Sequence, residues 1–411
     1  MSIMKKRWVV FAASCLINLC LGSIYAWSVL AGGMAEYLSA YTGNTVTTGD
    51  LAIVYTVANS VGPITMISGG FFNDKFGPKK VILTGGLLFG AGMILSGFAY
   101  SVGNLILTYG IVSGLGLGMA YGTTVSTCMK FFPDKRGIIG GITTAIYGLG
   151  SVVLPPVVTA ILQVSDGAQA FKIIGAAFLL IVCGASFFME QCPADFVPEG
   201  YQQQAGASSP AATNKSWKEM LCSPEFYVML PLFTCGAFSG MMIISQASAV
   251  AMNQIGMSAA MASAAVSVLA LFNASGRIIA GTLSDRIGRV NTLTIAAGLS
   301  VCGLLSLFMA GEGEYVSFYL GLAIVGLCFG AFMGIYPGFT ADCFGTKNNS
   351  VNYGIMFIGV ALAGYFGPTV MRSIYSADGS YGRAFLIAGI FGLAGLILTF
   401  AYRLITKSKK G

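Results

Sequence analysis

The chain has 411 residues, of which 55% are hydrophobic and 9% are charged, and its formal net charge is +7 at pH 7. Soluble domains carry about 25% charged residues, so this composition excludes an ordinary soluble protein and is typical of one embedded in a lipid bilayer. The basic residues form short clusters between apolar runs, which argues for membrane topology and against nucleic acid as a partner. Histidine is absent and no cysteine pair has metal-binding spacing, so we expect neither a metal nor an organic cofactor.

Twelve apolar segments follow one another along the chain, each long enough to cross a bilayer as a helix. They lie at 8–32, 51–72, 80–99, 104–129, 138–163, 169–189, 224–250, 259–281, 291–311, 315–341, 351–374 and 382–405. The first follows a basic cluster, as a secretory signal does, but its apolar run is too long for one and many more follow. Basic clusters occur in alternate loops, so the positive-inside rule predicts a multi-pass protein of the cell membrane with both termini cytoplasmic.

One extended polar region separates the sixth and seventh segments. It covers 191–223, is rich in Pro, Gly, Ala, Ser and Gln, and is predicted to be a cytoplasmic linker. We therefore expect an N-terminal six-helix half at 1–190 and a C-terminal six-helix half at 224–411. The predicted fold is an all-α membrane protein with twelve transmembrane helices in two pseudo-symmetric halves. In transporters built from such repeats, substrate binds between the repeats near the middle of the membrane.

The loops after the second and eighth segments carry the same motif, G-x3-D-[KR]-x-G. Its residues are Gly70, Asp74, Lys75 and Gly77 in the first copy and Gly281, Asp285, Arg286 and Gly288 in the second. The glycines permit a tight turn, and the aspartate can face a helix N-terminus or an arginine. The motif resembles the loop signature of the major facilitator superfamily, and this resemblance covers the whole chain. It implies a role in the gating of alternating access, while simple topology anchors are the alternative.

Two sets of residues inside the spans have a packing or binding interpretation. Glycines spaced by four in the fourth span form a ridge that lets a neighbouring helix approach closely; they are Gly110, Gly114, Gly118 and Gly122. The ridge lies inside an apolar span, so a nucleotide-binding loop is disfavoured. Buried tyrosine hydroxyls need a partner, and Tyr25, Tyr121 and Tyr147 lie deep enough for that partner to be a small polar ligand.

Arg277 is the only ionisable residue well inside any predicted span. Insertion scales put the cost of a charge at the membrane centre at about 2.5 to 3.5 kcal/mol, so a charge there indicates function. Asn273 lies four residues earlier, on the same helix face. Because no acidic residue in a span can neutralise Arg277, we expect an anion from outside, and the guanidinium fork matches a carboxylate. The alternative is that Arg277 snorkels to the cytoplasmic surface.

Within the superfamily, the sequence resembles the oxalate:formate antiporter family and the related monocarboxylate transporters. The resemblance is carried by "LGSIYAWSV", "GLGMAYG", "KFFPDKRG", "AIYGLGS", "NASGR" and "NYGIMFIG". It implies that Arg277 binds the substrate carboxylate. It also implies that aromatic residues wall the pocket, namely Tyr25, Tyr121, Tyr147, Phe329 and Phe357.

The sequence departs from each of these two groups of relatives at functional positions. The oxalate:formate antiporter has a lysine in the eleventh span where this chain has Val360, so one fixed charge remains and a monoanion fits better than oxalate. Animal monocarboxylate transporters have an aspartate where this chain has Asn273, which cannot titrate, and a first-span lysine is also missing. A proton could then travel on the substrate carboxyl, or anion exchange could replace proton coupling.

We therefore expect a secondary transporter rather than an enzyme, a monomer that moves lactate, pyruvate or similar monocarboxylates with a proton or a counter-anion. An oxalate:formate-type exchanger is the main alternative. A membrane enzyme is disfavoured because the spans contain no histidine, no acid away from their ends and no nucleophile beside a base. A passive channel would show flux without counterflow, and a sensor would bind substrate without moving it.

Overall fold

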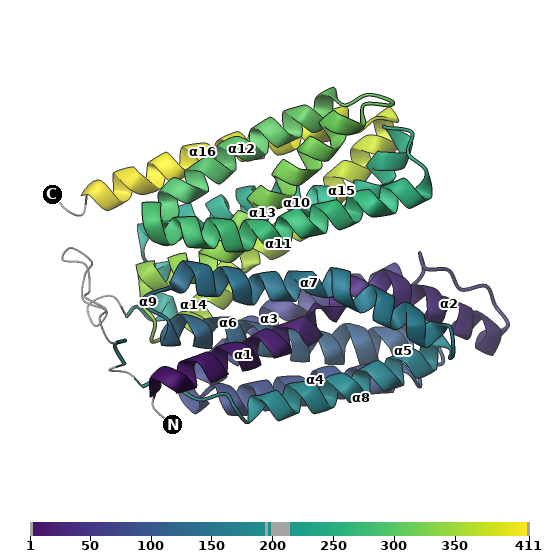
Figure 1. The fold of residues 1–411 in the computed structure, drawn as a ribbon, viewed down its shortest axis with the longest axis horizontal. Coiled ribbons are helices and arrows are strands. Elements are labelled where there is room, and N and C mark those ends of the chain that lie inside the picture. Colours follow the sequence, from purple (N-terminus) through teal and green to yellow (C-terminus); the bar gives the residue numbers. More distant parts are fainter. Residues whose placement is uncertain (1–2, 194–195, 199–213, 409–411) are drawn as a thin grey trace. The chain divides into compact units, whose positions relative to one another are not determined.

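The computed structural model describes residues 3–193, 196–198 and 214–408. These residues are mostly helical, and no β-strand occurs among them (Figure 1). Most of the linker predicted at 191–223 lies outside the described residues, namely 194–195 and 199–213. The all-α fold predicted from the sequence is confirmed for the described part of the chain.

Long helices form at all twelve predicted apolar segments. The first six segments are α1 (Ile3–Leu21), η1 (Gly22–Ala26) and α2 (Trp27–Thr42) in succession, α3 (Ala52–Phe76), α4 (Pro78–Ser96), then α5 (Val102–Leu105), η2 (Ile106–Ser113) and α6 (Gly114–Phe131) in succession, α7 (Arg136–Leu162) and α8 (Gly167–Ser186). After the short α9 (Trp217–Leu221) come α10 (Pro224–Asn253), α11 (Ala259–Ile287), α12 (Arg289–Met309), α13 (Tyr315–Phe344), α14 (Asn349–Met356) with α15 (Ile358–Asp378), and α16 (Gly382–Ser408). Among the described residues, eleven of these segments are long and apolar enough to cross a membrane. The exception is α3, which carries more polar side chains and is not among the eleven.

The described helices pack into two compact units. Unit 1 consists of Met1–Asp134, Ile146–Asn214 and Gly345–Ile355, and unit 2 of Lys135–Ala145, Lys215–Phe344 and Met356–Gly411. The first turns of α7 thus pack with the helices of unit 2, and most of α14 packs with those of unit 1. These units describe which helices pack together and do not test a division of the chain into two repeats. The halves at 1–190 and 224–411 therefore stay a prediction.

In unit 1, α6 packs closely on α3 along its glycine ridge. A Cβ atom added at Gly118 would lie 2.1 Å from the carbonyl oxygen of Gly62, and one added at Gly114 would lie 2.9 Å from that of Ala58. Larger residues at these positions would push the helices apart. The close approach predicted from the four-residue spacing is confirmed here.

In unit 2, α13 packs on α11 in the same way. A Cβ added at Gly330 would lie 2.1 Å from the Asn273 oxygen, and one added at Gly334 would lie 2.6 Å from the Arg277 oxygen. The two seams correspond in sequence, because the contacted positions in α3 and α11 differ by 273 − 62 = 211 residues and the glycines by 330 − 118 = 212. The internal repeat therefore extends from the loop motif to the packing of whole helices.

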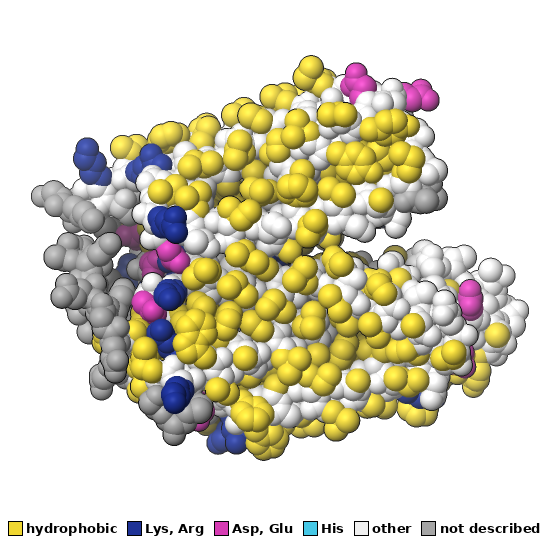
Figure 2. All heavy atoms as spheres, viewed as in Figure 1, with side chains coloured by type: hydrophobic (Ala, Val, Ile, Leu, Met, Phe, Trp, Pro, Cys, Tyr) yellow, Lys and Arg dark blue, Asp and Glu magenta, His cyan; other side chains and the backbone are white. Residues whose placement is uncertain are grey.

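The surface fits a protein embedded in a bilayer. Figure 2 shows hydrophobic side chains spread over much of the visible face, while the lysines and arginines visible there gather mainly at the left of the view. Exposed apolar side chains include Leu180, Val316 and Leu404, each at least 70% exposed. In water such a surface would be unfavourable, so these side chains are suited to face lipid.

Candidate functional site

Arg277 lies in the interior of α11, ten residues before the helix ends at Ile287, which corresponds to about 15 Å along the axis. Its side chain is fully buried, with 0% relative exposure. Nη1 donates a hydrogen bond to the Thr144 carbonyl oxygen in α7 at 2.6 Å, and Nε donates one to Asn273 Oδ1 at 3.2 Å. The side chain is therefore held by α7 and by its own helix and does not snorkel along α11 to the helix end.

The guanidinium keeps unused hydrogen-bonding capacity. Nη2 is buried and has no partner among the residues that the structure describes. Within the same described ranges, Arg277 forms no ion pair, although the other buried arginine, Arg7, pairs with Asp134 at 3.2 Å. A buried charge without a partner is strongly unfavourable, so this position is suited to receive an anion.

Glycines of two neighbouring helices fix the position of Arg277. A Cβ added at Gly141 of α7 would lie 2.3 Å from the Arg277 carbonyl oxygen, and Gly334 of α13 contacts the same oxygen. The backbone of α11 is thereby held between α7 and α13 at this point. The side chain consequently emerges between closely packed helices, where few rotamers are free of clashes.

In unit 1, the three predicted tyrosines come together. The ring centroids of Tyr25 and Tyr147 lie 5.5 Å apart in an edge-to-face arrangement, and those of Tyr121 and Tyr147 lie 4.7 Å apart. They come from η1, α6 and α7, and a Cβ at Gly22 would lie 2.2 Å from the Tyr147 carbonyl oxygen. The glycine before Tyr25 thus lets η1 approach α7 closely enough for the rings to meet.

The two predicted phenylalanines contact α10 in unit 2. Gly240 leaves the space that Phe329 fills, because a Cβ there would lie 2.3 Å from the Phe329 ring. The rings of Phe357 and Phe233 lie 6.4 Å apart in an edge-to-face arrangement. These contacts place both side chains against α10, and their role in binding substrate stays a prediction.

The first copy of the loop motif joins α3 to α6 and α14 within unit 1. Asp74 accepts hydrogen bonds from Lys130 Nζ at 2.7 Å and from Ser350 Oγ at 2.9 Å. Gly70 packs directly on the Ser350 backbone, since a Cβ there would lie 2.6 Å from its carbonyl carbon. The aspartate therefore holds the start of α14 against the end of α3.

The second copy makes equivalent contacts within unit 2. Asp285 accepts hydrogen bonds from the backbone N–H groups of Gly137 at 2.8 Å and Ile138 at 2.9 Å, at the N-terminus of α7. Arg289 Nη1 pairs with the same carboxylate at 2.6 Å, and a Cβ at Gly281 would lie 2.2 Å from the Gly137 oxygen. The carboxylate thus neutralises the positive end of a helix, as its residue type predicted.

The last glycine of each motif copy ends its helix. Gly77 has φ +82° and Gly288 has φ +92°, a region that other residues rarely adopt, and both positions are followed at once by another helix. The basic residues Lys75 and Arg286 are exposed to solvent. The glycines and aspartates of the motif thus each have a contact or conformation that accounts for them, while a function in gating stays a prediction.

Several residues of this network were missed by the sequence reasoning. Asp342 pairs with both Arg136 and Arg289, and Ser350 bridges Asp74 and Asn73. Lys130 and Arg136 occur in "KFFPDKRG", one of the stretches that carry the family resemblance, and this stretch could have marked them as functional candidates. Thr144 contributes only its backbone carbonyl, for which the sequence holds no signal.

Comparisons with known proteins agree with this architecture. The sequence profile described as Major Facilitator Superfamily matches residues 16–368. The oxalate:formate antiporter of Oxalobacter formigenes is 29% identical over 419 residues, covering 99% of this chain and 95% of that protein. Monocarboxylate transporter 12 of Xenopus laevis is 26% identical over 359 residues, covering 83% and 78%.

Among solved structures, the proton:xylose symporter XylE matches with a TM-score of 0.75 at 14% sequence identity, covering 97% of this chain and 96% of that one. This likeness concerns the fold alone. The profile match extends over 368 − 16 + 1 = 353 of the 411 residues. The chain therefore belongs to the major facilitator superfamily, and it is a multi-pass membrane transporter rather than an enzyme.

Proposed function

We propose that the protein transports small monocarboxylates by alternating access, with the substrate carboxylate bound to Arg277. The observation that carries this proposal is the buried guanidinium, whose Nη2 has no partner within the described ranges. A carboxylate supplies the opposite charge and two acceptors in the plane that a guanidinium matches. The names of the two relatives, which refer to oxalate, formate and monocarboxylates, support the same substrate class.

The charge count favours a monoanion. Of the two buried arginines that the structure describes, only Arg277 lacks an acidic partner. Val360 in α15 is buried and uncharged, at the position where the resemblance to the oxalate:formate antiporter implies a lysine. A dianion at this site would keep one negative charge unmatched, and burying such a charge is costly. Lactate and pyruvate carry one charge and a short apolar body.

The contacts of Arg277 also suggest how binding is coupled to movement. Nη2 is available at once, but bidentate binding of a carboxylate requires a second nitrogen, and Nη1 is held by the Thr144 carbonyl. Substrate that takes over Nη1 would break this contact between α7 and α11. Substrate binding would then weaken the packing of α7 in unit 2, which a transporter needs in order to change state.

We place proton coupling on the substrate itself. Asn273 cannot titrate, and Glu225 is the only buried acidic residue in the part of the chain that the structure describes. Glu225 lies in the first turn of α10 and pairs with Lys215 at 3.9 Å. We therefore propose that a proton travels on the substrate carboxyl, and the antiporter relative makes anion exchange the second candidate.

The decisive experiment is uptake of labelled L-lactate into proteoliposomes, with and without an inward proton gradient. Unlabelled pyruvate, formate and oxalate serve as competitors. Saturable uptake that is driven by the gradient and inhibited by pyruvate supports proton-linked monocarboxylate transport. Uptake that requires an internal anion and is inhibited best by oxalate supports exchange, and no saturable uptake of any of these acids overturns the proposal.

A further inference from the structure

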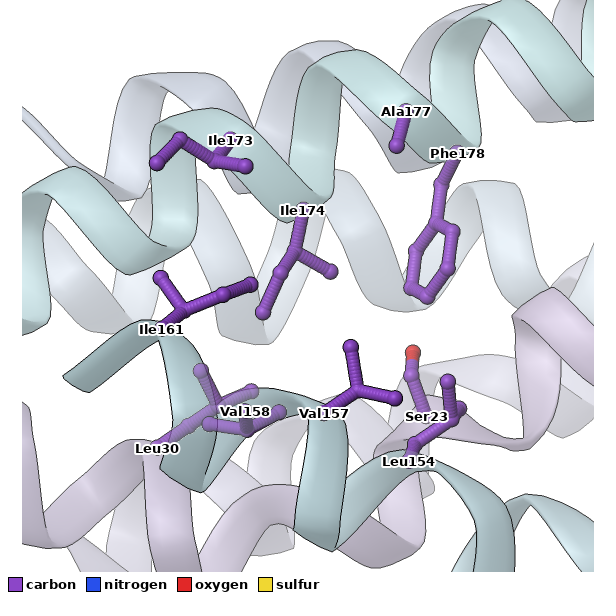
Figure 3. Close-up of a pocket in the computed structure, with 10 residues that line it drawn as sticks. All are labelled: Ser23, Leu30, Leu154, Val157, Val158, Ile161, Ile173, Ile174, Ala177 and Phe178. Atoms are coloured by element: carbon purple, nitrogen blue, oxygen red, sulfur yellow. The ribbon is translucent and has the colours of Figure 1, made fainter. Parts of the chain in front are cut away.

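Unit 1 contains a cavity of about 260 Å³ that none of the residues discussed for transport lines. It lies between the η1–α2 region, α7 and α8 (Figure 3). Leu30, Val158 and Phe178 represent its three walls, and all but one of its lining side chains are apolar. The exception is Ser23, which belongs to the stretch "LGSIYAWSV".

The Ser23 hydroxyl is buried without a protein partner. The residue is 2% exposed, and its Oγ has no hydrogen bond among the residues that the structure describes. Figure 3 shows this oxygen pointing into the space toward Phe178. Other serines in these helices donate to a carbonyl of the preceding turn, for example Ser151 to Gly148 at 2.8 Å. An unsatisfied hydroxyl in an apolar wall is unfavourable, so a ligand that bonds to it would be favoured.

The lining restricts the chemistry of such a ligand. No charged side chain lines the cavity, so an anion such as the proposed substrate would not bind there. Val157 and Ile173 line the cavity and are 48% and 44% exposed, which indicates that the cavity opens on a surface suited to lipid. An apolar cavity of about 150 Å³ binds benzene, so this volume has room for about ten non-hydrogen atoms.

We propose that this cavity binds a neutral medium-chain amphiphile dissolved in the bilayer. The occupant has a straight alkyl chain of about eight carbons between α7 and α8, and one hydroxyl or protonated carboxyl that hydrogen-bonds to Ser23 Oγ. Leu154, which lines the cavity, lies seven residues after Tyr147, which places both on one face of α7. A ligand wedged here restrains α7 and slows transport without competing with substrate, a consequence that rests on the proposed function.

Photolabelling tests the binding site independently of transport. The protein in lipid nanodiscs is labelled with a diazirine-bearing octanol, and the modified residues are mapped by mass spectrometry with unlabelled octanol as competitor. We expect saturable adducts on the cavity-facing residues of α7 and α8. Ser23→Ala should weaken competition by about two- to tenfold, the range that loss of one hydrogen bond gives.

A filled cavity and a matched control make the result specific. Ala177→Phe places a ring at the cavity wall and should abolish these adducts, whereas Ala176→Phe, exposed on the same helix but not part of the lining, should leave them unchanged. Adducts spread over all lipid-facing helices, or unaffected by Ala177→Phe, would mean that bilayer acyl chains fill the space and would overturn the site. If lactate uptake is measurable, inhibition by octanol that excess lactate relieves would overturn the separate mode of action.

Discussion

Replacing Arg277 by alanine tests the central interaction of the proposed site. The substitution removes the only buried positive charge without an acidic partner in the described ranges, together with the free Nη2 donor. Removing one partner of a buried ion pair costs about 3 to 5 kcal/mol, which corresponds to an affinity loss of about 140- to 4,000-fold. Uptake of labelled lactate by Arg277→Ala should therefore fall to background at substrate concentrations near the wild-type KM.

The same substitution should lower stability less than most core truncations do. It removes the hydrogen bonds to Thr144 and Asn273, but it also removes a desolvated charge. Replacing buried charge by apolar side chains is often neutral or stabilising, so the thermal midpoint of Arg277→Ala should not drop substantially. A folded but inactive variant distinguishes a binding role from a structural one.

Two variants complete the experiment. Arg277→Lys keeps the charge but loses the planar fork, so we expect residual uptake with a raised KM. Arg372→Ala removes an arginine of α15 that is exposed to the surface, and it should transport like the wild type. Arg277→Ala with uptake within twofold of the Arg372→Ala control would refute the reasoning, because the substrate would then need no fixed cation at this position.

Three further substitutions test other parts of the structure. Val360→Lys should shift inhibition of uptake toward oxalate because it adds a second cation, and unchanged selectivity would mean that this face of α15 is remote from substrate. Gly330→Ala should destabilise the fold by about 1 to 3 kcal/mol and so lower the unfolding temperature, because its Cβ would lie 2.1 Å from an α11 carbonyl oxygen. Gly298→Ala is the control and should leave the unfolding temperature unchanged, because no atom lies within 4 Å of its added Cβ. Asp285→Asn should speed hydrogen exchange of the first α7 amides because it loses the charge that faces them and Arg289, and equal exchange rates would argue against this contact.

The sequence predicted the fold well because the membrane leaves few options. In hydrocarbon, the backbone N–H and C=O groups of a long apolar run must pair with one another, and a helix pairs them within the run itself. Twelve helical segments could therefore be assigned from composition alone. Helix ends were less predictable. Asp74 and Asp285 lie within the last turn of α3 and α11, beyond the predicted apolar segments, because helical hydrogen bonding continues after the apolar residues end.

The candidate site was predictable only as far as side-chain chemistry reveals it. Arg277 and Asn273 stand out because they are polar residues in an apolar helix. Thr144 and Gly141 do not, because their contribution is a backbone oxygen and the absence of a side chain. Their roles depend on which helices become neighbours, and the sequence of one segment does not contain that information.

The glycines of α13 are an intermediate case. Gly326, Gly330 and Gly334 have the four-residue spacing that was noticed in α6. The repeat offset of 285 − 74 = 211 residues taken from the loop motif leads from Gly114, Gly118 and Gly122 to within one residue of them. The same offset pairs Gly62 and Met66 of α3 with Asn273 and Arg277. The corresponding positions in α3 are Gly62 and Met66, so the polar pair occurs in only one of the two repeats.

The uncompensated charge of Arg277 also has an electrical consequence. When the empty carrier changes state, this guanidinium is unpaired, whereas the carrier loaded with a deprotonated monoanion, as in exchange, is neutral at the same position. Moving one elementary charge through a membrane potential of 100 mV changes the energy by about 2.3 kcal/mol. The empty step should therefore depend on voltage, by up to about 50-fold if the charge senses the whole field, while the loaded step should be nearly insensitive to it. Exchange, which uses only loaded steps, would then proceed at the same rate in polarised and depolarised vesicles, and net uptake would not.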